Sequence, residues 1–123
     1  MKSTIKGYQD LQVWKRARFF FKQIHILTRA FPKEELFCLT QQMRRSALSI
    51  PSNLAEGHLR HGTKDYIHFV SIAIGSAAEL ETQLLLAFDL EYVTKTAFAP
   101  YLDEIDQIQK MLHGLRQSLK SKL

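Results

Sequence analysis

The chain has 123 residues, 46% of them apolar, which is enough for one buried core and too little for two domains. We therefore expect a single domain over residues 1–123. No apolar run approaches the ~20 residues of a membrane helix, and the N-terminus lacks the apolar core of a signal peptide, so a cytoplasmic protein without a membrane partner is predicted. The single cysteine, Cys38, excludes an internal disulfide and is expected to be a buried structural thiol.

The positive charge is concentrated in the first half of the chain. Residues 1–64 hold twelve of the seventeen Lys and Arg residues but only four of the twelve acidic residues, although the formal net charge of the whole chain is only +5. A basic half of this kind favours an anionic partner such as a nucleic acid.

The first predicted helix follows Asp10, its expected N-cap, and is ended by Pro32. Its apolar stripe consists of Trp14, Ala17, Phe21, Ile24 and Phe31, widened by Val13, Phe20 and Leu27, with Phe19 outside it. On the opposite side, four cations lie within roughly 60° of one another. These four residues, which we call the basic ridge, are Lys15, Arg18, Lys22 and Arg29. With no acid to neutralise it, the ridge is either an ordinary solvated face or a row of phosphate contacts.

The second predicted helix is an antiparallel neighbour of the first, because the connection between them is short. Glu34 and Glu35 suit the positive end at which this helix is expected to begin, and Gly57 is expected to end it. Its apolar residues recur at spacings of three and four and continue past Pro51, where one helical hydrogen bond is lost. A polar stripe lies roughly 120° around the helix. It consists of Gln42, Arg45, Ser49, Asn53 and Glu56.

The turn over residues 58–62 is basic and contains two histidines. His61, Asp65 and His68 have helical spacing and permit interpretation as a metal site. A solvated turn, with Thr63 capping the next helix, accounts for the same residues without a cofactor, and this is our prediction. The chain contains no Glu-x-x-His pair, which disfavours a ferritin-like metal bundle.

The third predicted helix, residues 64–90, is the most apolar and has two apolar seams. The first seam runs from Tyr66 to Phe88, and the second is formed by Ile67, Ile74, Ala78 and Leu85. One stripe per helix is enough for a four-helix bundle, so the excess apolar surface favours packing between subunits. The alternative is a broad core that consumes both seams.

A structural polar network is expected between the second and third helices. Glu79 lies among apolar neighbours and, if buried, needs a cation, for which Arg45 is the candidate. Asn53 and Glu56 are expected close to the same network. Glu56 and Glu79 lack an attendant nucleophile, metal motif or phosphate loop, so a catalytic carboxylate pair is disfavoured and no enzyme is predicted.

The fourth predicted helix follows Thr94, its expected N-cap, and its apolar residues recur without a fault from Phe98 to Leu119. Its acids lie early and its cations late, as the helix dipole favours. Four helices with short connections predict an all-α fold, an antiparallel up-down-up-down four-helix bundle.

Several short segments together carry a family resemblance. They are Tyr8-Gln9-Asp10-Leu11, Trp14, Arg45, Ser46, Ile50-Pro51-Ser52-Asn53, Ala55-Glu56-Gly57, Gly75-Ser76 and Glu79-Leu80-Glu81. The chain resembles the bacterial four-helix-bundle family of proteins encoded in intervening sequences of large-subunit ribosomal RNA genes and of accessory variability proteins of diversity-generating retroelements. The resemblance implies a ring-like homopentamer and a reverse transcriptase as one partner. The family usually has glycine where Glu91 stands, so a different closure of the third helix is expected.

We therefore predict a non-enzymatic, oligomeric protein that binds the backbone of RNA or DNA with little sequence specificity. The basic ridge is the expected contact surface, with Arg44, Arg60 and Lys64 as extensions. No base-reading module is visible in the sequence. The alternative function is that of a protein-interaction scaffold or accessory subunit, such as a partner of a reverse transcriptase.

Overall fold

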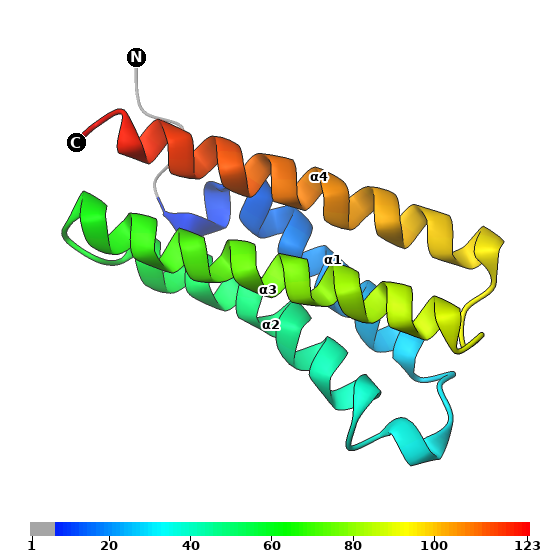
Figure 1. Cartoon of the computed structure of the whole chain (residues 1–123). Coiled ribbons are helices and arrows are strands. Elements are labelled where there is room, and N and C mark those ends of the chain that lie inside the picture. The colour runs from blue at the N-terminus through cyan, green and yellow to red at the C-terminus, as the bar shows by residue number, and fades with distance from the viewer. Residues whose placement is uncertain (1–6) are drawn as a thin grey trace.

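The computed structural model describes residues 7–123, and four helices pack around a shared core (Figure 1). The helices are α1 (Gln12–Thr28), α2 (Leu39–His58), α3 (Thr63–Asp89) and α4 (Lys95–Lys120). Two short 3-10 turns, η1 (Tyr8–Asp10) and η2 (Lys33–Glu35), precede α1 and α2. The residues from 7 onward contain no strand, and the predicted all-α four-helix bundle is confirmed.

Consecutive helices run antiparallel, so the connections alternate between the two ends of the bundle. One end gathers the start of α1, the α2–α3 turn and the last turn of α4, and the other end gathers the α1–α2 and α3–α4 connections (Figure 1). The α2 and α3 helices pack together most closely, whereas α1 and α4 make the fewest contacts of any two neighbouring helices. The bundle is therefore loosest along the line between its first and last helices.

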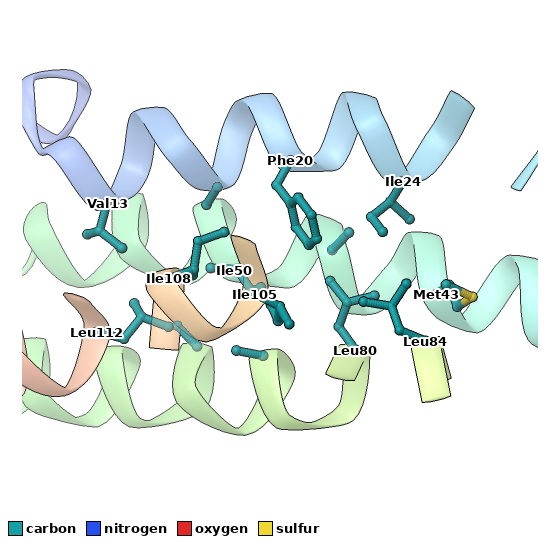
Figure 2. Packing of buried hydrophobic residues seen from close by; sticks show 14 of the residues in the cluster. Val13, Phe20, Ile24, Met43, Ile50, Leu80, Leu84, Ile105, Ile108 and Leu112 are labelled. Carbon is teal, nitrogen blue, oxygen red and sulfur yellow. The ribbon is translucent and has the colours of Figure 1, made fainter. Parts of the chain in front are cut away.

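The core draws large apolar side chains from all four helices, and they point toward one another between the ribbons (Figure 2). Each of the following is at most 2% exposed: Phe20, Ile24, Met43, Ile50, Leu80, Leu84, Ile105, Ile108 and Leu112. Burial of one such side chain contributes about 1.5–3 kcal/mol. In α1 the buried stripe is centred on Val13, Ala17, Phe20 and Ile24, whereas the predicted Trp14 and Phe21 are only half-buried.

The α1–α2 connection differs from the sequence prediction. Residues 33–35 form η2, and α2 begins only at Leu39 because the backbone of Cys38 is not helical. Glu35 joins two elements here, since its carboxylate accepts hydrogen bonds from the Leu39 N–H at 3.4 Å and from the Tyr92 hydroxyl at 2.6 Å. The bond to Glu35 raises the pKa of Tyr92 to about 12. Cys38 is exposed in this connection, so the prediction of a buried thiol is wrong.

The N-caps confirm one prediction and correct two. Thr94 caps α4 as predicted, because its Oγ1 accepts a hydrogen bond from the Ala97 N–H at 3.2 Å. Asp10 does not cap α1: it belongs to η1, and Leu11 occupies the N-cap position. Thr63 is already the first residue of α3, with Gly62 before it as the N-cap.

The C-terminus of α3 closes with a Schellman motif. The Tyr92 N–H bonds to the Ala87 carbonyl, and the Glu91 N–H bonds to the Phe88 carbonyl, each at 2.9 Å. Glu91 has φ 63°, a left-handed conformation that glycine adopts freely and that costs another residue about 1–2 kcal/mol. Glu91 therefore takes a conformation that glycine adopts freely, and the expected difference from the family's closure stays a prediction.

The outward face of α3 carries exposed apolar side chains among polar ones. The first seam is buried or half-buried, whereas in the second seam Ala78 and Leu85 are exposed. Leu86 and Leu90 are exposed outside both seams. The core thus buries the first seam and only part of the second. By length and composition α3 could also cross a membrane, which corrects the expectation that no segment approaches such a span. An apolar core helix meets the same criterion.

Candidate nucleic-acid interface

The basic ridge lies along the outer side of α1. Lys15, Arg18, Lys22 and Arg29 are all exposed, and none forms an ion pair with any residue between 7 and 123. The Arg18 guanidinium lies over the Trp14 ring, 5.6 Å from its centroid, a contact that leaves the positive charge at the surface. Because α1 rises ~1.5 Å per residue, the ridge extends over roughly 20 Å. This length spans several phosphates of a nucleic-acid strand.

The proposed extension at Arg44 is drawn into the structure. Its Nε donates to the Thr28 hydroxyl at 2.9 Å, and its terminal nitrogen donates to the His25 carbonyl at 3.5 Å, so the half-buried side chain ties α2 to α1. His25 contributes little charge near pH 7, because partial burial, followed by the charges of Arg44 and Arg29, lowers its pKa. Neither Arg44 nor His25 therefore adds a free positive charge to the ridge.

The other two extensions lie near the α2–α3 turn, at the end of the bundle where α1 begins (Figure 1). Arg60 pairs with Glu56 at 3.7 Å and lies over the Phe69 ring, 4.9 Å from its centroid. Lys64 is exposed and makes no ion pair with a described residue. Of the three extensions, Lys64 is thus the one whose charge is least engaged.

A groove of about 540 Å³ runs beside the ridge, between α1 and α4. It is lined by Lys15, Arg16, Phe19, Phe20, Gln23, Pro100, Tyr101 and Glu104. Arg16 spans the groove through two hydrogen bonds to the Glu104 carboxylate, at 2.7 and 3.0 Å. These bonds raise the pKa of Arg16. Sequence reasoning missed this pair, because residues 88 positions apart carry no local pattern that links them.

The predicted polar network has a different arrangement in the structure. Asn53 donates to the Ser49 carbonyl and hydroxyl at 2.8 and 2.9 Å, and the Ser76 hydroxyl donates to that of Ser49 at 2.7 Å. Arg45 and Glu79 line a groove of about 360 Å³ beside these serines, which we call the α2–α3 groove. They form no ion pair with each other.

Two of the predicted network residues are placed differently from the expectation. Glu79 is exposed, so the condition of burial under which it would need a cation is not met. The apolar residues next to it in sequence point to other faces of α3. Glu56 pairs with Arg60 instead of joining the serines. Across residues 7–123, no group of three or more His, Cys, Asp and Glu side chains lies close enough to hold a metal ion.

Comparison with known proteins identifies the family. Residues 9–114 match the sequence profile of the 23S rRNA-intervening sequence proteins. The chain belongs to this family. Among solved structures it is similar to a protein of unknown function from the S23 ribosomal protein family of Bacteroides thetaiotaomicron, with 26% sequence identity and a TM-score of 0.79 over 85% of this chain and 97% of that one. No protein with a curated description matches.

The match to the 23S rRNA-intervening sequence proteins runs from the turn before α1 to Gly114 in α4. It therefore includes the basic ridge, the α1–α4 groove and the α2–α3 groove. The predicted resemblance is confirmed for this branch, whereas the link to retroelement accessory proteins stays a prediction.

Proposed function

We propose that this 23S rRNA-intervening sequence protein is a non-enzymatic, self-associating protein that binds the phosphate backbone of a nucleic acid. The observation that carries the proposal is the basic ridge, four exposed cations on one helix face with no acidic partner among residues 7–123. Lysine and arginine contacts of this kind attract phosphates but read no bases, so sequence specificity is low.

RNA is the first nucleic acid to test, since the family takes its name from intervening sequences of 23S rRNA. Glu56 and Glu79, the two carboxylates considered for catalysis, have different surroundings, and this supports a non-enzymatic role. Glu56 is engaged by Arg60, while Glu79 lines the α2–α3 groove with serines and arginine. Neither glutamate has the partner geometry that a general acid and base require.

Self-association is supported by apolar surface that a single subunit leaves uncovered. Leu86 on α3 is 47% exposed, Leu90 just after α3 is 52% exposed, and Phe37 before α2 is 84% exposed. Exposed apolar patches of this kind commonly mark interaction sites. The family resemblance implies a ring of five subunits, in which repeated ridges bind one strand by multivalent contact.

The salt dependence of RNA affinity tests the proposed binding. If one subunit neutralises about four phosphates of a single strand, the affinity falls about 50-fold between about 50 and 200 mM salt, and more if several ridges act together. Two unstructured RNAs of equal length and unrelated sequence are expected to bind within about threefold of each other. Fluorescence anisotropy with labelled RNA measures both quantities. Binding that is insensitive to salt, or that prefers one sequence strongly, contradicts the proposal.

A further inference from the structure

The groove between α1 and α4 lies where two neighbouring helices of the bundle approach each other least closely. Its volume of about 540 Å³ lies within the ~300–1,000 Å³ of typical small-molecule sites. It also adjoins the basic ridge, since Lys15 belongs to both. A ligand on the ridge therefore has a recess directly beside it.

The wall of this groove carries an aromatic ring that the core does not use. Phe19 is 60% exposed although it lies one residue before the fully buried Phe20. Farther in, Tyr101 packs against Phe20 with ring centroids 6.1 Å apart, and Pro100 lies beside it. Phe19, Phe20, Pro100 and Tyr101 thus form an apolar part of the lining, in which Phe19 is the most exposed ring. Aromatic side chains next to a basic track are the platforms on which unpaired bases stack in single-strand-binding proteins.

The charges around Phe19 fit a phosphodiester strand. Lys15 and Lys22 lie four residues before and three residues after Phe19, so both flank its ring on the same helix face. Glu104 is the single acid that lines the groove, and both of its oxygens are held by Arg16. The carboxylate is thereby neutralised, and the recess presents a positive rim around an aromatic wall.

We propose that the α1–α4 groove takes an unpaired base of single-stranded RNA, stacked on Phe19, with the flanking phosphates on Lys15 and Lys22. This inference rests on the proposed RNA binding and names the form of RNA that the site prefers. In a duplex both faces of each base are covered by neighbouring pairs, so a duplex reaches the ridge but not the ring. The protein is therefore expected to bind single-stranded RNA more tightly than duplex RNA.

The test compares an unstructured RNA oligonucleotide with a duplex of the same length. Phe19→Ala is expected to weaken single-strand binding about fivefold or more and to leave duplex binding within about twofold. Phe19→Trp is expected to restore single-strand binding. The control is Leu59→Ala, because Leu59 is another large apolar side chain, is 66% exposed, and lies outside the groove. Circular-dichroism melting checks that each variant folds. In wild-type protein, the fluorescence of 2-aminopurine in the single strand should fall on binding, and Phe19→Ala should reduce this change.

The outcomes separate this inference from the proposed function. If Phe19→Ala binds single-stranded RNA as well as wild type while loss of the ridge charges removes binding, the groove proposal is overturned and the ridge proposal stands. Equal weakening of single-strand and duplex binding by Phe19→Ala also overturns base stacking. If wild-type protein binds neither RNA, both proposals fail.

Discussion

Reversal of the four charges of the basic ridge is expected to lower the affinity for RNA about 100-fold or more, because nonspecific binding depends almost wholly on charge. The variant carries Lys15→Glu, Arg18→Glu, Lys22→Glu and Arg29→Glu. All four side chains are exposed and form no ion pair with a described residue, so the bundle should keep its helical circular-dichroism signal. Anisotropy with labelled RNA at low salt measures the loss.

A matched control separates the position of the charges from their number. Lys33, Lys95, Lys120 and Lys122 are also exposed and lie outside α1. Each reversal to glutamate changes the charge by two, so both fourfold variants lower the formal net charge from +5 to −3. The control variant is expected to keep most of the affinity. An equal loss in both variants would show that overall charge, not the ridge, governs binding.

Gly57→Ala is expected to lower the free energy of unfolding by up to about 2 kcal/mol. A Cβ at residue 57 would lie 2.8 Å from the Phe69 Cβ and 3.1 Å from the Tyr66 ring. The Phe69 Cβ is fixed to the backbone of α3 and cannot swing aside, so the two most closely packed helices must separate. Overpacking of this kind costs about 1–3 kcal/mol, partly offset by the better helix propensity of alanine, worth about 1 kcal/mol.

Gly114→Ala is the control for this prediction, because it makes the same change in another helix. Nothing lies within 4 Å of a Cβ added at Gly114, so helix propensity acts alone and stability should rise by up to about 1 kcal/mol. Urea unfolding followed by circular dichroism gives both values. A gain in stability from Gly57→Ala would contradict the close packing of α2 and α3 at this point.

The residues of α4 show how much of the fold the sequence predicts. Apolar residues recur at spacings of three and four from Phe98 to Leu119, and Phe98, Ile105, Ile108, Leu112 and Leu119 are buried as that pattern requires. The spacing directly reflects one helix face in contact with a core. Exposure of the basic ridge follows from the same rule, since its cations lie opposite the apolar stripe of α1.

Helix ends and contacts between helices were less predictable. Gly57 was expected to end α2, but α2 continues to His58, and the glycine instead permits the close approach of α3. The exposure of Glu79 was misjudged because apolar neighbours in sequence do not share its face of α3. The Arg16–Glu104 pair and the groove that it spans depend on how α1 and α4 are placed, which neither helix encodes alone.

The measurement that tests the central claim most directly is the mass of the purified protein by size-exclusion chromatography with light scattering, with and without RNA. At low salt we expect a particle of several times the 14.3 kDa of one chain, five times by the family resemblance, that gains mass with RNA and releases it as salt rises. A 14.3 kDa particle that ignores RNA at every salt concentration would contradict the account. An oligomer indifferent to RNA would contradict nucleic-acid binding and favour a protein partner.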